Sequence, residues 1–236
     1  MRLRLRIVSP AMTTSPSPAV DALLAELRSL EDEKIREVNA RHGDDHAVNL
    51  TKLRAIAKRL KTQQELARAL WATGDSAARL LALLICKPKA FDEAELDAML
   101  RAARTPKVQD WLVNYVVKKS PHAEALRVVW FADADPVVAS AGWALTTERV
   151  AKRPGGLDVD GLLDQIEAEL VDAPERLQWA MNHCLAQIGI EHPKLRPRAL
   201  EIGERLGVLK DYPTAPGCTS PFAPIWITEI VRRREG

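Results

Sequence analysis

Cysteine is scarce in this sequence of 236 residues, which contains only three. Cys86, Cys184 and Cys218 lie far apart, and none belongs to a CxxC motif or to a cysteine and histidine spacing that suits zinc. The sequence therefore offers no disulfide framework and no zinc motif. We expect a reduced, cytoplasmic protein that holds no metal and no other cofactor.

Long hydrophobic runs are also absent. The apolar stretch at residues 80–85 is far shorter than the ~20 residues that cross a bilayer, so we predict no association with a membrane. The first residues alternate arginine with apolar side chains, a pattern that does not predict a signal peptide. We expect residues 1–18 to form a disordered lead, in which Met12 is an alternative start.

Neither sign of charge is in large excess. The chain has 34 Lys and Arg residues against 32 Asp and Glu, a net charge of +2 that excludes a histone-like polycation. With 47% hydrophobic and 28% charged residues, the composition is that of an ordinary globular protein. Phe and Tyr are rare, at three and two residues, whereas Trp occurs six times. The tryptophans therefore need an explanation.

Motifs for common enzyme chemistry are missing as well. The sequence contains no phosphate-binding loop, dinucleotide fingerprint, metalloprotease helix, serine-hydrolase elbow or calcium loop. His42 and His46 stand beside Asp44 and Asp45, a combination that suits either a metal site or a solvated loop, and we favour the loop.

The pattern that is present is helical. Ala and Leu are abundant, Gly is limited to 11 residues, and no segment alternates β-branched with polar residues. We predict an all-α fold with a first helix over residues 19–41. A proline-rich segment at 212–224 precedes a final helix at 225–234, and we expect it to be an extended segment that caps the fold.

Beyond residue 50 a helix pair repeats. Four helix openers, at Asp75, Thr105, Asp135 and Ala173, follow one another at intervals of 30, 30 and 38 residues. They introduce predicted helices at 78–85, 108–117, 137–145 and 177–188, and second helices are predicted between them at 92–104, 123–132 and 159–171. Because such a pair cannot bury both faces alone, the repeat predicts an α-solenoid of the HEAT-like or ARM type, in one domain over residues 19–236. An irregular helical bundle is the alternative.

Basic residues gather in three groups. The groups are Lys52, Arg54, Lys58, Arg59 and Lys61; Lys118 and Lys119; and Arg149, Lys152 and Arg153. Cations near helix C-termini complement the helix dipole, which is one explanation. The other is a stripe of cations that follows a nucleic-acid backbone, and it requires the acidic residues to lie on another face.

Three tryptophans recur at equivalent depth in successive repeats: Trp111, Trp143 and Trp179. Equivalent positions of a solenoid share one surface, and indoles beside cations suit nucleic-acid binding through stacking. Filling the core is the alternative. We favour the core for Trp143, among Ala and Leu, and the surface for Trp111, beside Asp110.

The sequence resembles the DNA alkylation repair proteins with HEAT-like repeats, the AlkD type of 3-methyladenine and 7-methylguanine DNA glycosylase. The resemblance covers residues 48–234 and rests on the segments 49–58, 66–75, 110–115, 179–189 and 217–226. It implies an α-solenoid that cups duplex DNA on a basic concave surface. It also implies that Trp, Asp and Arg side chains assist the loss of a cationic alkylated purine, a reaction that one carboxylate near the sugar can promote.

The residues that the resemblance would make catalytic are only partly retained. The family's Trp-x-x-x-Asp motif corresponds to Trp111 followed by Tyr115, its arginine falls near Ala139 and Ser140, and its second tryptophan corresponds to His183. Asp110 lies five residues before Tyr115 and, at 100° per residue, would point about 140° away. The glycosylase motif is therefore degenerate.

We predict a monomeric protein that binds duplex DNA, alkylated or not, and leave its glycosylase activity open. The candidate catalytic residues are Tyr115, Asn114, Asp110 and His183, and the candidate DNA-binding residues are Trp111, Trp179, Lys118, Lys119, Arg149 and Lys152. The rival prediction is a non-catalytic solenoid scaffold that binds a protein partner.

Overall fold

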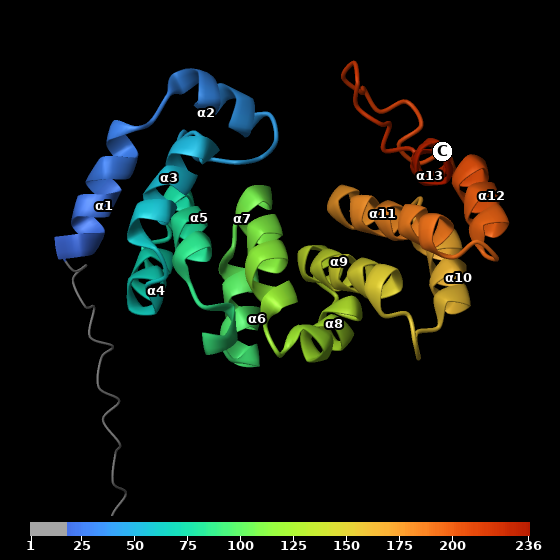
Figure 1. Cartoon of the computed structure of the whole chain (residues 1–236), viewed down its shortest axis with the longest axis horizontal. Coiled ribbons are helices and arrows are strands. Elements are labelled where there is room, and N and C mark those ends of the chain that lie inside the picture. Colours follow the sequence, from blue (N-terminus) through green and yellow to red (C-terminus); the bar gives the residue numbers. More distant parts are fainter. Residues whose placement is uncertain (1–17) are drawn as a thin grey trace, which may run out of the picture. The chain divides into compact units, whose positions relative to one another are not determined.

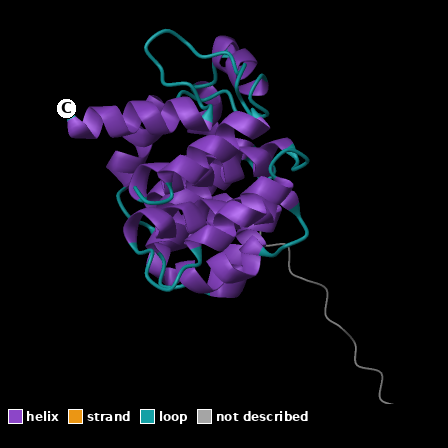
Figure 2. Ribbon diagram, turned by 90° about the vertical axis from the view of Figure 1, so that its right-hand side faces the viewer, coloured by secondary structure: helices purple, strands orange, loops and turns teal. Residues whose placement is uncertain are grey.

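The computed structural model describes residues 18–236, and the chain divides after Cys86 into two compact units. Within the described residues all regular structure is helical, apart from one isolated bridge between Glu31 and Val48, which confirms the all-α prediction (Figures 1 and 2). The lead predicted for residues 1–18 lies outside the described residues, except for Pro18. None of the described helices has the length and apolar character needed to span a bilayer.

The first unit contains five described helices. The prediction of one helix over 19–41 is wrong, because the chain breaks at Asp32. This residue is extended (φ −139°, ψ 126°), and its carboxylate accepts hydrogen bonds from the backbone N–H groups of Lys34 and Ile35, so it caps a second helix. The helices of this unit are α1 (Pro18–Ser29), α2 (Glu33–Ala40), α3 (Leu50–Leu60), α4 (Gln64–Ala72) and α5 (Ser76–Ile85).

Helix α5 forms the core of the first unit. It packs against α1, α3 and α4, and Leu80, Leu81 and Ile85 have no exposed surface. Its start follows the prediction, since the Asp75 carboxylate accepts a hydrogen bond from the N–H of Ala78 at 2.7 Å.

The second unit contains the remaining helices, and each repeat helix predicted after residue 87 has a counterpart among them, whereas the helix predicted at 78–85 is α5 of the first unit. The exception to the prediction is a helix at 196–206, introduced by Pro197 and ended by Gly207 with a positive φ of 65°, which we had not expected. The helices are α6 (Glu93–Ala102), α7 (Pro106–Trp111), α8 (Ala123–Phe131), α9 (Pro136–Lys152), α10 (Val159–Glu169), α11 (Glu175–Glu191), α12 (Arg196–Leu206) and α13 (Ala223–Glu235).

The long helices α9 and α11 pack against each other at the centre of the second unit (Figure 1). Trp143 of α9 is buried, as predicted, together with Leu163, Met181, Ile188 and other apolar side chains of α10, α11 and α13. Helix α8 covers another side of α9 and approaches it closely at Gly142, where a Cβ would lie 2.3 Å from the backbone nitrogen of Phe131.

Three of the four predicted helix openers occupy the expected N-cap position. Asp135 accepts a hydrogen bond from the N–H of Val137 at 2.9 Å, whereas Thr105 stands at the N-cap without a side-chain bond. The fourth prediction is off by one residue, since Pro174 is the N-cap of α11 rather than Ala173. Proline is therefore the first helical residue in only two of these helices, α7 and α9.

Helix α7 continues into an irregular segment. A π-helical turn at Leu112–Val116 follows it, and a short 3₁₀ turn at Val117–Lys119 ends it. A π turn takes one more residue than an α turn, and such turns are frequent at functional sites. The predicted helix at 108–117 is thus present but not regular.

The predicted proline-rich segment at 212–224 contains no helix before Ala223. It is held against the second unit where the side-chain amide of Asn182 donates a hydrogen bond to the carbonyl of Pro221 at 2.8 Å. Phe222 is buried beside this contact, which places the segment against α11.

Candidate nucleic-acid interface

Six of the residues around the predicted site form two rows on the second unit. Asp110, Asn114 and Lys118 follow one another along α7, the π turn and the 3₁₀ turn, and Arg176, Trp179 and His183 follow one another along α11. An ion pair between Asp110 Oδ1 and Arg176 Nη2, 2.7 Å apart, joins the rows at one end. At the other end the charge of Lys118 acts on His183. We call these six residues the two-row surface.

The first row does not follow a regular helix. Asp110 lies in α7, Asn114 in the π turn and Lys118 in the 3₁₀ turn, and these three segments turn by different angles per residue. Lys118 Nζ donates to Asn114 Oδ1 at 2.7 Å, which links two members of the row. The 140° separation expected for Asp110 and Tyr115 assumed a regular helix and does not apply.

Aromatic rings support the second row. The Trp179 ring meets the Tyr212 ring edge to face, with centroids 5.0 Å apart. The His183 ring stacks on Trp226, with centroids 5.0 Å apart and an interplanar angle of 6°. The C-terminal segment and α13 therefore position the ring of each of these two residues.

The His183 residue is exposed to solvent, yet the pKa of its imidazole lies below the ordinary value for histidine. Desolvation by the surrounding protein is the larger cause, and the positive charge of Lys118 is the second. The lowered pKa favours the neutral imidazole, whose ring stacks on Trp226.

Trp111 does not lie at the surface. Only 7% of the residue is exposed, so the prediction of a surface indole is wrong. Its ring packs against Tyr115, with centroids 5.1 Å apart and planes at 67°, and Lys119 Nζ lies 5.5 Å from the centre of the Tyr115 ring. The residue that replaces the expected carboxylate is thus part of an aromatic and cationic contact.

The predicted cations are paired with acids instead of being separated from them. Glu148 of α9 contacts Lys118 at 3.3 Å and Lys152 at 2.9 Å, and Glu124 of α8 contacts Arg149 at 2.9 Å. Burial raises the pKa of Glu148, but its bonds to the two lysines outweigh that effect and keep the pKa below the usual value. The expected separation of charge is not found at these positions. Arg149 and Lys152 lie on α9, outside the two-row surface.

No group of three or more potential ligands among residues 18–236 could hold a metal ion. The segment at 42–46 is a loop, as favoured, but only part of it is solvated: His42, Gly43 and Asp45 are exposed, whereas Asp44 and His46 are both 5% exposed. Asn39 anchors it by donating from its side-chain amide to the His46 carbonyl at 2.8 Å.

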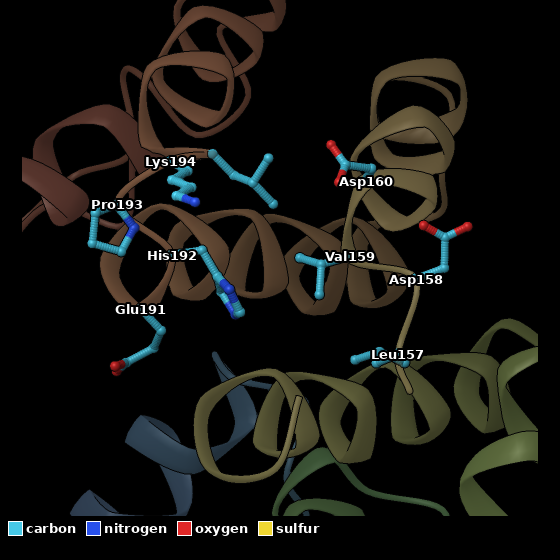
Figure 3. A pocket seen from close by; sticks show the side chains of 9 residues that line it. Leu157, Asp158, Val159, Asp160, Glu191, His192, Pro193 and Lys194 are labelled. Carbon is cyan, nitrogen blue, oxygen red and sulfur yellow. The ribbon is translucent and has the colours of Figure 1, made fainter. Parts of the chain in front are cut away.

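A hollow of about 620 Å³ lies elsewhere on the second unit. Figure 3 shows Asp158 and Asp160 at the start of α10, with His192 and Lys194 on the turn between α11 and α12. None of the predicted site residues lines it. His192 is engaged there with the carbonyl of Val150 at 3.3 Å.

Sequence reasoning missed Arg176, Glu148, Tyr212 and Trp226. Each acts through a partner distant in the chain, such as Asp110 for Arg176, 66 residues away. Spacing along one helix carries no signal of such contacts.

Comparison with known proteins gives one family and one structure. A family model described as DNA alkylation repair enzyme matches residues 23–227. A solved structure, described as a new family of proteins related to the HEAT-like repeat DNA glycosylases with affinity for branched DNA structures, is 26% identical with a TM-score of 0.73. The match covers 91% of this chain and 94% of the chain in that structure. No curated protein matches the sequence. The structural match confirms the predicted HEAT-like repeat fold.

Proposed function

The chain belongs to the DNA alkylation repair enzyme family, and we propose that it binds DNA through the two-row surface of its second unit. The observation that carries this proposal is the combination of rings and cations there. The rings of Trp179 and His183 are each held by a second ring. The cations of this surface are Lys118 and Arg176, each of which also contacts a carboxylate, and Lys119 follows Lys118 with its Nζ 5.5 Å from the centre of the Tyr115 ring. In such a combination the aromatic rings can stack on bases and the cations can contact phosphates of DNA.

We further propose that branched DNA is the preferred ligand. The similar solved structure belongs to proteins with affinity for branched DNA structures. Where a branch point is open, the base pairs at the ends of its arms lack a stacking neighbour. An aromatic ring that a second ring holds in place can cover such an end. The pairs Trp179 with Tyr212 and His183 with Trp226 supply these rings.

We propose that the chain does not release alkylated purines by carboxylate-assisted chemistry. Tyr115 stands where the family's carboxylate is expected, and its ring is packed between Trp111 and Lys119. The neighbouring carboxylate of Asp110 is neutralised by Arg176. The position expected for the catalytic arginine holds Ala139 and Ser140, each 5% exposed. A cationic sugar would find no unpaired carboxylate among these side chains.

The test compares the affinity of the chain for a four-way DNA junction and for a linear duplex with the same number of base pairs. We expect tighter binding to the junction, with log K falling steeply as log salt rises. A second arm measures release of methylated bases from alkylated duplex DNA by the wild type, by Tyr115→Phe and by Asp110→Asn, and we expect none above the uncatalysed rate. Release by the wild type would overturn the third proposal.

The scaffold alternative makes the opposite prediction for the first arm. A surface built for a protein partner would bind neither DNA, even at low salt, and the proposed function would then be wrong. We also propose that the chain acts as a monomer, which sedimentation of the free protein checks.

A further inference from the structure

A second charged surface lies on the first unit, on α3. Between Asp45 and Glu65 the sequence contains five cations and no carboxylate. In the structure Leu53 and Ile56 are buried, whereas the cations stand on the opposite, exposed side of this helix. We call this side, with its continuation just past the helix end, the α3 cation face. It consists of Lys52, Arg54, Lys58, Arg59 and Lys61.

Helix stability does not explain this face. Cations are favourable in the last turn of a helix, where Lys58 and Arg59 lie, but unfavourable in the first turn, where Lys52 lies and no acidic residue is present. Arg54 and Lys58, four residues apart, are like charges on one side of the helix and oppose its formation. The charges at the start of α3 therefore act against the helix that carries them, which points to a role in binding.

Three of the five cations of the face have no partner in the described chain, whereas Arg54 and Arg59 each have one. Arg59 Nη2 contacts Glu26 Oε2 of α1 at 2.6 Å. Lys52, Lys58 and Lys61 have no ion pair or hydrogen bond from their side chains within residues 18–236. In the two-row surface, by contrast, both Lys118 and Arg176 contact a carboxylate. The α3 cation face thus keeps more unneutralised charge than the candidate interface itself.

The backbone of Lys61 has an unusual conformation. Lys61 follows the last residue of α3 and has φ 57° and ψ −154°, in the half of conformational space that favours glycine. A lysine at such a position bears a backbone cost that glycine would avoid. Its charge extends the face past the helix end.

The face fits nucleic-acid phosphates better than a membrane surface. A helix that lies in a lipid interface buries large apolar side chains beside its cations. The uncharged exposed residues on this side of α3 are Thr51 and Ala55, and no large exposed hydrophobic residue of the described chain belongs to α3. The chemistry is that of a cationic surface without an apolar anchor, as phosphate backbones require.

Resting on the proposed function, we propose that the α3 cation face binds the phosphates of a second arm of a branched DNA, while the two-row surface binds the branch point. The two surfaces belong to different compact units. Two weak contacts with one ligand give a higher overall affinity than either contact alone, because the second contact forms at a high effective concentration once the first is made. A branched DNA that reaches both surfaces therefore binds more tightly than a single arm, which reaches one.

The test uses the full chain with Lys52→Gln and Lys58→Gln together, and a four-way junction and a linear duplex equal to one of its arms. Binding is followed by fluorescence anisotropy over a range of salt. We expect junction affinity to fall about tenfold or more, and the slope of log K against log salt to become shallower by about 1.8, since each lost contact removes about 0.9. The single-arm duplex should weaken by less than about threefold.

The matched control removes two other exposed lysines, by Lys89→Gln and Lys194→Gln, and thereby changes the net charge equally. We expect the control to bind both DNAs like the wild type. Equal weakening of the junction and the single arm, or equal effects of the control and the α3 variant, would overturn the inference. Circular dichroism melting confirms that the variants fold.

Two further outcomes separate this inference from its neighbours. If the wild type and the α3 variant bind DNA equally well, only the α3 inference is overturned. If the wild type binds no DNA, the proposed function is overturned as well. Vesicles containing phosphatidylserine test the membrane alternative. Vesicle binding that the α3 substitutions abolish, with junction binding unchanged, would assign the face to lipid.

Discussion

Arg176 and Asp110 form an ion pair, Nη2 to Oδ1 at 2.7 Å, although 66 residues separate them in the chain. The pair joins the start of α11 to α7 and thereby fixes one end of the two-row surface. The Nε atom of Arg176 is buried and has no hydrogen-bond partner within residues 18–236. Because Nε is buried, a phosphate can approach only the exposed part of this side chain, which is 30% exposed.

Asp110→Asn should strengthen DNA binding. The substitution removes the negative charge that neutralises Arg176, so the guanidinium can make one more phosphate contact. We expect the salt slope of log K to steepen by about 0.9. Stability should change by less than about 1 kcal/mol, because the two side chains are 30% and 55% exposed. Glu204→Gln on α12 removes an equal charge away from the surface and should change neither quantity. Weaker binding by Asp110→Asn would contradict a role of Arg176 in binding.

Gly142→Ala should destabilise the second unit. A Cβ at this position of α9 would lie 2.3 Å from the backbone nitrogen of Phe131, and backbone cannot move aside as a side chain can. Alanine favours helices by up to about 1 kcal/mol over glycine, but the overlap should outweigh this gain, leaving a net loss of about 1–3 kcal/mol. Denaturant unfolding measures it. Gly155→Ala, with nothing within 4 Å, is the control and should stay within about 0.5 kcal/mol of the wild type.

One cysteine should react with a thiol reagent in the native protein. Cys218 is exposed, whereas Cys86 and Cys184 are buried. Burial raises the pKa of the Cys184 thiol to about 12, so that thiolate is nearly absent at pH 8. Ellman's reagent should therefore release one equivalent quickly, none from Cys218→Ser, and three from the denatured wild type. Rapid release of two equivalents from the native wild type would show that the core of a unit opens readily.

Local features of the fold could be predicted from the sequence. Asp75 and Asp135 mark the starts of α5 and α9 because an N-cap needs only the residues next to it. The same local chemistry produced one error, since Asp32 is also an N-cap but stands inside a continuous helical pattern. The break there is supported by the bridge from Glu31 to Val48, a contact between distant residues.

The candidate site was less predictable than the fold, because its geometry depends on contacts between helices. The spacing of the three tryptophans predicted one shared surface, but Trp111 and Trp143 are buried whereas Trp179 is partly exposed. The π turn at Leu112–Val116 interrupts the helix before Lys118, and no pattern that we used distinguishes it from an α turn. The neutralising partners of the cations, such as Glu148, come from a different helix.

His183 gives a prediction about pH, because its pKa is lowered in the folded protein. Unfolded histidine titrates near pH 6.5. Below that pH the unfolded chain takes up a proton more readily than the folded one, so this residue's contribution to stability is present above about pH 6.5 and is lost as the pH falls through the folded pKa. Lys118→Gln removes one of the two causes and should raise the pKa of His183 toward its ordinary value.

Histidine ring signals in NMR spectra, with His183→Gln to assign the residue, follow this shift directly. Lys34→Gln on α2 is the control and should leave the pKa of His183 unchanged. The phosphates of bound DNA should raise that pKa further, because negative charge favours the imidazolium. By linkage, DNA binding should then strengthen as the pH falls from 7 to 6, and His183→Gln should flatten this dependence. If the pKa of His183 is unchanged in Lys118→Gln, the charge of Lys118 does not reach His183, and the two rows are not joined at this end of the surface. If the pKa of His183 is unchanged when DNA binds, the phosphates do not bind near His183.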